Sequence, residues 1–236
     1  MTSSKKSIST RSTTVKAFLD QASKVPAPID SESQGRLIFA MDATASREPC
    51  WDMACQIQTD MFSQTATLGQ LQIQLCYYQG YGEFHAANWS QNAIQLQEYM
   101  SSVSCKAGQT QINRVLQHTL KQSKYQKIDA LVFVGDCMEE LADKLIGSAG
   151  QLALHNIPVF IFHEGHEPIA ESTFRQIAKI TKGAYCRFDQ SSAEQLRALL
   201  NAVAIFVVGG IDALQKHCKQ SNLSNQIVKQ LTDRSS

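Results

Sequence analysis

The sequence lacks a strong excess of either charge. It contains 22 Lys and Arg residues against 21 Asp and Glu residues, which gives a formal net charge of +1. The basic residues are scattered along the chain rather than gathered in one stretch. Nucleic-acid binding depends on a concentrated basic surface that neutralises phosphates. We therefore expect no nucleic-acid partner.

The sequence also lacks a segment typical of a membrane span. The apolar segment Ala198–Ile211 is interrupted by Asn201 and falls short of the roughly 20 residues that a spanning helix needs. The basic N-terminus has no apolar core of a secretory signal, and a transit peptide is the less favoured alternative. We therefore expect no membrane partner.

The sequence has no C-x-x-C pair, although it contains seven cysteines. An odd number of cysteines, most of them inside apolar stretches, is typical of reduced thiols that pack as small hydrophobic residues. Disulfides persist mainly in oxidising compartments. We therefore expect a cytoplasmic protein.

Common catalytic motifs are missing as well. The sequence contains no G-x-S-x-G elbow, no G-x-x-x-x-G-K-S/T loop and no G-x-G-x-x-G fingerprint. A phosphatase of the haloacid dehalogenase type would need a second Asp two positions after Asp42, where Thr44 stands. We therefore expect a protein that is not an enzyme. A Mg²⁺-dependent phosphatase or other hydrolase on a similar α/β sheet is the alternative.

Strand-like and helix-like segments alternate along most of the chain. This order predicts crossover connections, and hence a three-layer, doubly wound α/β fold with a mostly parallel, Rossmann-like sheet. The strands are expected at 36–42, 71–78, 83–89, 128–136, 157–165 and 184–188. The helices are expected at 50–62, 93–100, 110–122, 139–155, 171–182 and 193–208.

The composition divides the chain into three parts. Residues 1–35 are rich in Ser, Thr and Lys, which predicts a flexible N-terminal arm with at most a short helix. Residues 36–208 are expected to form the α/β domain. Residues 209–236 follow a Gly-Gly break and are expected to form a C-terminal helical tail laid on the domain, or alternatively a tail that binds a partner.

Oxygen-bearing side chains follow two strands and precede one helix. Asp42, Thr44 and Ser46 come directly after the first strand, Thr110 lies ahead of a helix, and Asp136 closes the strand LVFV. Ligands of open α/β sheets bind where the carboxyl ends of the strands converge. Residues two apart in an extended segment point the same way, and Mg²⁺ prefers oxygen ligands. The sequence therefore predicts a Mg²⁺ or Mn²⁺ site there.

The order Asp-x-Thr-x-Ser, Gly-x-Thr and a strand-terminal Asp, over roughly 36–208, resembles the von Willebrand factor A domain with its metal-ion-dependent adhesion site (MIDAS). The resemblance implies that Thr44, Ser46 and Thr110 bind the ion directly, and that Asp42 and Asp136 hold it directly or through water. It also implies that an Asp or Glu of a partner protein completes the coordination. The predicted function is a divalent-metal-dependent protein-binding module.

One residue departs from the pattern, and several others have structural explanations. Many members of the family place Gly where Cys137 stands, so the third loop is expected to differ locally. We expect Glu139 and Glu140 to cap a helix, and His163 and His166 to lie in a surface loop. The tyrosines at 77, 78 and 81 indicate a packed edge near an exposed turn, with a binding face as the alternative.

Overall fold

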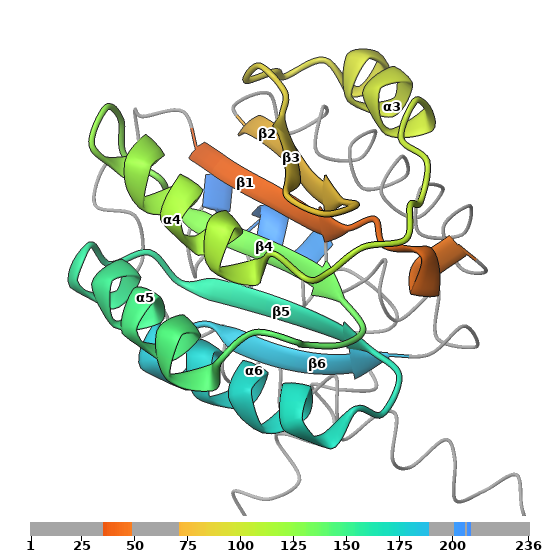
Figure 1. The fold of residues 1–236 in the computed structure, drawn as a ribbon. Coiled ribbons are helices and arrows are strands. Elements are labelled where there is room, and N and C mark those ends of the chain that lie inside the picture. Colours follow the sequence, from red (N-terminus) through yellow and green to blue (C-terminus); the bar gives the residue numbers. More distant parts are fainter. Residues whose placement is uncertain (1–34, 49–70, 189–200, 206, 209–236) are drawn as a thin grey trace, which may run out of the picture.

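The computed structural model describes residues 35–48, 71–188, 201–205, 207 and 208 (Figure 1). They form a six-stranded sheet with the order β3-β2-β1-β4-β5-β6, in which only β3 runs antiparallel. The mostly parallel α/β fold predicted from the sequence is therefore confirmed. The strands are β1 (Gly35–Asp42), β2 (Leu71–Gln79), β3 (Glu83–Ala86), β4 (Ala130–Gly135), β5 (Val159–Glu164) and β6 (Ala184–Phe188).

The central strands are buried on both faces, which explains their continuous apolar sequences. In β1, Leu37, Phe39 and Met41 pack into the core on one side of the sheet. Ile38 and Ala40 alternate with them and pack into the core on the other side. Each face of the sheet therefore has its own core and needs its own cover of helices.

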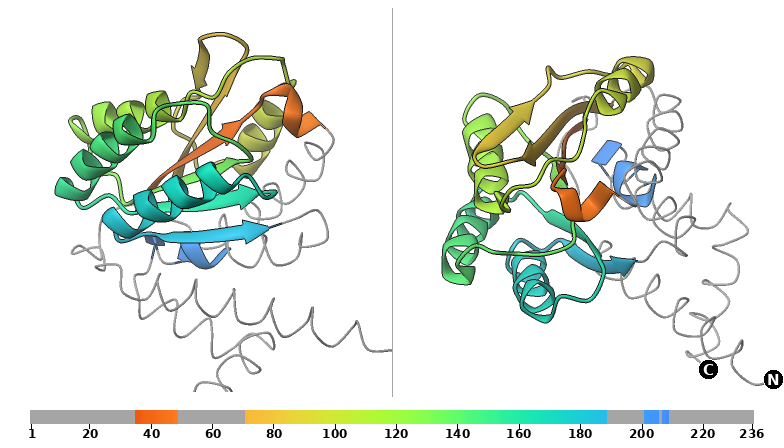
Figure 2. Two further views of the ribbon diagram at one scale, coloured as in Figure 1. Left: turned by 60° about the horizontal axis from the view of Figure 1, so that its bottom comes forward. Right: turned by 45° about the vertical axis from the view of Figure 1, so that its right-hand side comes forward.

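Helices provide that cover on both faces, as Figure 2 shows. Helices α4 (Ile112–Ser123), α5 (Ala142–Leu154) and α6 (Pro168–Ile180) pack on the face of Ile38. Helix α3 (Ala93–Ser101) and the helical residues 201–205, 207 and 208 pack on the opposite face. In the part of the chain that the structure describes, no helix combines the length and apolarity of a membrane span.

Helix α3 begins at Ala93 as predicted, whereas the starts of the other three labelled helices differ from the prediction by two or three residues. Helix α4 begins at Ile112 and α5 at Ala142, later than predicted. Helix α6 begins earlier, at Pro168, because the carboxylate of Glu167 accepts hydrogen bonds from the first free backbone N–H groups. The predicted helix at 50–62, nearly all of the arm at 1–35, most of the helix at 193–208 and the tail at 209–236 lie outside the described residues.

Candidate metal site at the carboxyl edge of the sheet

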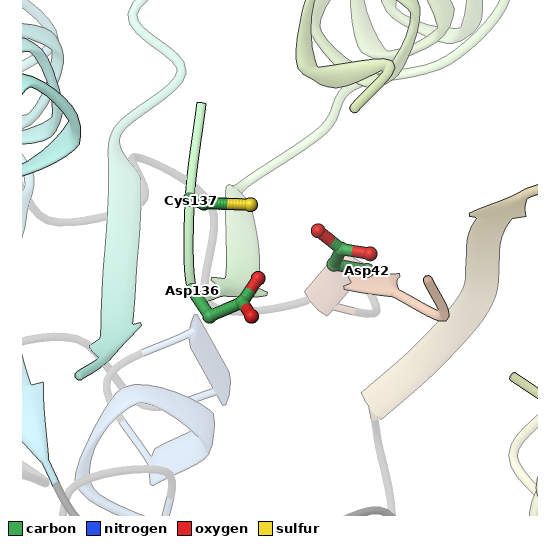
Figure 3. Close-up of side chains that lie close together, drawn as sticks. All are labelled: Asp42, Asp136 and Cys137. Atoms are coloured by element: carbon green, nitrogen blue, oxygen red, sulfur yellow. The ribbon is translucent and has the colours of Figure 1, made fainter. Parts of the chain in front are cut away.

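The strand register brings two of the predicted ligands together. Met41 pairs with Val134, so Asp42 and Asp136 leave adjacent parallel strands at the same edge. One ligand atom each of Asp42, Asp136 and Cys137 lies within 4.8 Å of the others. In Figure 3 the carboxylate of Asp136 and the thiol of Cys137 are directed toward Asp42. The edge therefore carries a compact group of two carboxylates and one thiol.

Asp42 is fully buried, and both of its carboxylate oxygens accept hydrogen bonds. The backbone N–H of Thr44 donates to Oδ1 at 2.8 Å, and the hydroxyl of Tyr78 donates to Oδ2 at 2.9 Å. Burial raises the pKa of Asp42, and the nearby charge of Asp136 adds to this effect. The hydrogen bonds from Thr44 and the charge of Arg47 oppose it. A cation at this edge would favour the charged form.

Tyr78 is a site residue that the sequence analysis did not assign. It pairs directly with Asp42 in the register between β1 and β2, and its side chain is fully buried rather than placed at a surface turn. Burial raises the pKa of Tyr78 well above its usual value, and the Asp42 carboxylate adds to the shift. The phenol therefore stays protonated and holds Asp42 in a fixed orientation.

Asp136 differs from Asp42 in its hydrogen bonding. Its Oδ1 atom is buried and accepts no hydrogen bond from any described residue. Buried carboxylate oxygens are normally paired, because leaving one unpaired costs free energy. An unpaired buried oxygen beside a second carboxylate fits the requirements of a bound cation. The residues present are therefore compatible with a divalent metal.

Cys137 does not strain the third loop. Among the described residues, the only non-glycine residues with positive φ are Asn156 and Lys182. Cys137 therefore adopts an ordinary backbone conformation, and the loop still places Asp136 next to Asp42. Burial raises the pKa of the Cys137 thiol to about 12, and the adjacent Asp136 adds to the shift. The thiol is protonated in the metal-free protein.

The first loop runs alongside the loop that precedes α4. Thr44 forms an isolated parallel bridge with Lys106, and the Lys106 N–H donates to the carbonyl of Ala43 at 3.0 Å. The hydroxyls of Thr44 and Ser46 lie 3.1 Å apart, but Ala45–Arg47 forms a 3-10 helix rather than the predicted extended segment. Thr44 is buried and Ser46 is exposed. The pair provides neutral oxygen atoms at the rim of the site.

Thr110 joins the second loop to the third. Its N–H donates to the carboxylate of Glu139 at 3.0 Å, and its Oγ1 accepts from the Glu139 N–H at 3.0 Å. Glu140 accepts hydrogen bonds from the N–H groups of Ile112 and Asn113. Glu140 therefore caps a helix as expected, but the helix is α4 rather than the one that follows it. These contacts hold Thr110 beside the segment that follows Asp136.

Two further buried residues lie close to this edge. The guanidinium of Arg47 is fully buried and forms an ion pair with Glu164 at 3.4 Å. His163 is also buried, so the prediction of a surface-loop histidine is wrong for this residue, whereas His166 is exposed. Ring nitrogens of His163 lie 3.0 Å from the Asp136 carbonyl and 2.9 Å from the Tyr185 hydroxyl. Because β5 continues to Glu164, His163 belongs to the strand.

Solved structures share the architecture of this chain. The pilus adhesin SpaC from Lactobacillus rhamnosus GG matches with a TM-score of 0.61 and 11% identity, over 76% of this chain and 30% of the adhesin. The von Willebrand factor A domain of SpRpn10 matches with a TM-score of 0.56 and 13% identity, over 73% of this chain and 94% of that domain. The chain thus spans less than a third of the adhesin but nearly all of the isolated domain.

A third similar structure contains a metal. Proximal thread matrix protein 1 from the mussel byssus, with a zinc-occupied MIDAS motif, matches with a TM-score of 0.57 and 13% identity, over 76% of this chain and 47% of that protein. No protein-family model and no curated protein matches the sequence. At such low identities the similarity defines the fold alone. The chain therefore has the fold of von Willebrand factor A domains.

Proposed function

We propose that this protein is a divalent-cation-dependent protein-binding module. In this proposal Asp42, Thr44, Ser46, Thr110 and Asp136 hold Mg²⁺ or Mn²⁺, directly or through water, at the carboxyl edge of the sheet. An Asp or Glu side chain of a partner protein supplies a further oxygen ligand. Two carboxylates and several hydroxyls leave room for such a ligand, because Mg²⁺ prefers six oxygen atoms.

One observation carries this proposal. Asp136 Oδ1 is buried next to the carboxylate of Asp42 and accepts no hydrogen bond from any described residue. Two like charges at this separation repel each other, and the charge of Asp136 contributes to the raised pKa of Asp42. A divalent cation would remove the repulsion and give Asp136 Oδ1 its missing partner. No such gain would follow if the two aspartates were only turn or cap residues.

Exposed hydrophobic side chains near the same edge support binding of a protein. Tyr81 follows β2, Leu141 follows β4 and Ile169 follows β5, and their exposed fractions are 78%, 79% and 64%. All three segments leave carboxyl ends of parallel strands. Apolar residues around a central polar contact are typical of protein interfaces. The similar structures include a pilus adhesin, which agrees with a binding role.

Titration calorimetry of the full chain with Mg²⁺ and Mn²⁺ tests the metal site. We expect weak binding that is lost in Asp42→Ala and Thr110→Ala. Glu48→Ala is the control, because Glu48 is an exposed acidic residue just beyond the first loop. Equal binding by all three variants and the parent protein would contradict the proposal.

A display library of peptides centred on Asp or Glu tests the partner chemistry. Captured peptides should be released by chelator, rebound with Mg²⁺, and lost when the acidic residue is changed to its amide. Leu141→Ala should weaken capture, whereas Leu154→Ala should not. Leu154 is equally exposed but ends α5 at the opposite edge of the sheet. Capture that is unaffected by chelator would contradict a metal-bridged contact.

The remaining expectations are also proposals. We propose a reducing compartment, and the four cysteines in the described ranges agree with it because all are free thiols. We also propose that the protein is not an enzyme. Screening the full chain with generic phosphomonoesters in the presence of Mg²⁺ distinguishes a non-catalytic protein from a hydrolase. Turnover that disappears in Asp42→Ala would favour the hydrolase.

A further inference from the structure

Cys137 adds a third kind of ligand atom to the candidate metal site. Its Sγ belongs to the group in which the ligand atoms of Asp42, Asp136 and Cys137 all lie within 4.8 Å of one another. Figure 3 shows the thiol on the same side as the Asp136 carboxylate, directed toward Asp42. The unpaired, buried Oδ1 of Asp136 is a separate indication that this group can bind a cation.

A thiol changes which cation such a group prefers. Mg²⁺ is a hard ion that takes oxygen ligands in a near-octahedral arrangement and gains little from sulfur. Zn²⁺ binds Cys sulfur and Asp oxygen, commonly with four ligands in a tetrahedron. Three protein ligands and one open position are the arrangement found where zinc also binds a water molecule or an exogenous group. The donor set here is two carboxylates and one thiol.

We propose that this site selects Zn²⁺ over Mg²⁺, with Cys137 Sγ as a metal ligand beside the carboxylates of Asp42 and Asp136. The inference rests on the proposed function for the place of the site, but it assigns a different ion and a ligand outside the adhesion motif. Binding replaces the S–H bond of Cys137 by a sulfur–zinc bond and releases one proton to the solvent. The fourth position remains open for water or for a partner's carboxylate.

The chain provides a matched control cysteine. Cys105 is partly buried like Cys137, and the charges of Asp42 and Asp136 influence both thiols. Burial raises the pKa of Cys105 as well, to about 11. Cys105 is not part of the group of ligand atoms around Asp42. A general effect of a thiol near the site would involve both cysteines, whereas coordination as proposed involves only Cys137.

Titration of the full chain with Co²⁺ tests whether sulfur binds the metal. Cobalt replaces zinc in such sites, and a thiolate ligand gives an intense near-ultraviolet charge-transfer band. We expect this band in the parent protein and in Cys105→Ser, and its loss in Cys137→Ser and in Asp136→Asn. Thermal melts without metal verify that each variant is folded. A band that persists in Cys137→Ser, or that vanishes only in Cys105→Ser, would overturn the inference.

Competition between metals measures the selectivity. We expect Zn²⁺ to bind the parent protein at least about tenfold more tightly than Mg²⁺, and Cys137→Gly to reduce this preference by about tenfold or more. Mg²⁺ affinity should stay unchanged in Cys137→Gly. If Mg²⁺ binds through Asp42 and Asp136 but Zn²⁺ affinity is the same with and without Cys137, this inference fails and the proposed function stands. If no divalent ion responds to Asp42→Ala or Asp136→Asn, both fail.

Discussion

The two ends of strand β4 each carry an aspartate, and the protein surrounds the two carboxylates differently. Asp129 precedes the strand, and both of its oxygens have partners: the Arg36 N–H donates to Oδ2 at 2.9 Å, and Lys127 Nζ lies 2.9 Å from Oδ1. Asp136 follows the strand, and its buried Oδ1 accepts no hydrogen bond from the described part of the chain. The same residue type thus has a complete set of partners at one end and an incomplete set at the other.

This difference distinguishes Asp129, a carboxylate with a structural role, from Asp136, a carboxylate that is proposed to bind a metal ion. At the amino end of β4, the chain itself compensates the charge of Asp129 and fixes the start of the strand. At the carboxyl end, Asp42 and Asp136 repel each other, and the pKa of Asp42 is raised mainly by burial. An arrangement that costs stability is expected where a function needs it. The comparison teaches that a buried carboxylate oxygen without a hydrogen-bond partner marks the functional edge.

The largest expected effect comes from exchanging each aspartate for its amide. Asp136→Asn should reduce divalent-metal affinity by at least about tenfold, because the ion loses a charged ligand. The same change should leave the metal-free protein as stable as the parent or more stable, since it removes the repulsion with Asp42 at an oxygen that no described residue pairs. Calorimetry with Mg²⁺ and Zn²⁺ and chemical unfolding in chelator measure the two quantities.

Asp129→Asn is the matched change at the other end of β4. It should leave metal affinity unchanged and lower the free energy of unfolding by about 1 kcal/mol, because a half-exposed ion pair and one backbone hydrogen bond are weakened. If Asp136→Asn destabilises the metal-free protein more than Asp129→Asn does, the distinction between ligand and structural carboxylate is wrong.

A second prediction concerns the hydrogen bond that fixes Asp42. Tyr78→Phe removes the donor to Asp42 Oδ2 and leaves that buried oxygen unpaired. The free energy of unfolding of the metal-free protein should fall by about 1–3 kcal/mol. Chemical unfolding in chelator measures the loss. Added metal should restore part of it, because the ion gives the oxygen a new partner.

Tyr185→Phe is the matched change, because it removes a tyrosine hydroxyl whose partner is a neutral histidine ring rather than a carboxylate. The Tyr185 hydroxyl lies 2.9 Å from Nδ1 of buried His163, on the neighbouring strand. Its loss should cost less, about 1 kcal/mol, and metal should not restore it. Equal losses for the two tyrosines, with no recovery by metal, would show that Tyr78 does not serve the metal site.

The sequence predicted the sheet more accurately than the ends of its helices. Short continuous apolar runs, as in β1, β4 and β5, are typical of strands buried on both faces, so their positions followed from the local sequence. The start of α4, by contrast, depends on partners distant in sequence. The carboxylates of Glu139 and Glu140 bond to Thr110 and to the first turn of α4, 27 to 29 residues away. No local pattern reveals such contacts.

The grouping of Asp42 with Asp136 followed from the sequence, whereas the residues that hold them and the place of Cys137 beside them did not. Asp42, Thr44 and Ser46 stand out because they follow a buried strand at a spacing of two. Tyr78 became part of the site only through the register that pairs it with Asp42. His163 was predicted to lie in a surface loop because it stands near the end of a predicted strand, but its ring contacts Tyr185, 22 residues further along the chain. Register and long-range pairing are fixed by the fold as a whole.

A third, smaller effect distinguishes two glutamates that cap helices. Glu140 accepts from the N–H groups of Ile112 and Asn113, and Glu167 accepts from those of Ile169 and Ala170. Glu140→Ala and Glu167→Ala should each lower the free energy of unfolding by about 1 kcal/mol, as loss of a helix cap does. Chemical unfolding of both variants measures this cost.

The two glutamate variants should differ in their affinity for metal. Glu140 fixes the first turn of α4, two residues beyond Thr110, so Glu140→Ala should also weaken metal binding in calorimetry. Glu167→Ala should leave the affinity unchanged, because α6 carries no predicted ligand. If both variants bind metal like the parent, Thr110 does not depend on the α4 cap, or it is not a ligand.

The smallest expected effect is the pH dependence that His163 adds at the functional end of β4. Burial lowers the pKa of His163 below its ordinary value of 6.5, although the Asp136 carbonyl partly opposes this shift. The folded protein therefore binds this proton less readily than the unfolded chain, and stability falls as the pH drops below 6.5 toward the folded pKa. Unfolding followed between neutral and mildly acidic pH should show this loss.

His163→Gln tests the origin of that loss, because the amide can still donate to the Asp136 carbonyl but cannot take up a proton. The variant should lose less stability on acidification than the parent protein.

His118→Gln is the comparison at a distance from Asp136, since burial also lowers the pKa of His118, which contacts Gln74. It should flatten the same pH profile without changing metal affinity. His163→Gln should weaken metal binding slightly at neutral pH, because an amide holds the Asp136 carbonyl less rigidly than a packed imidazole. If His163→Gln and His118→Gln are indistinguishable in both measurements, His163 does not position Asp136.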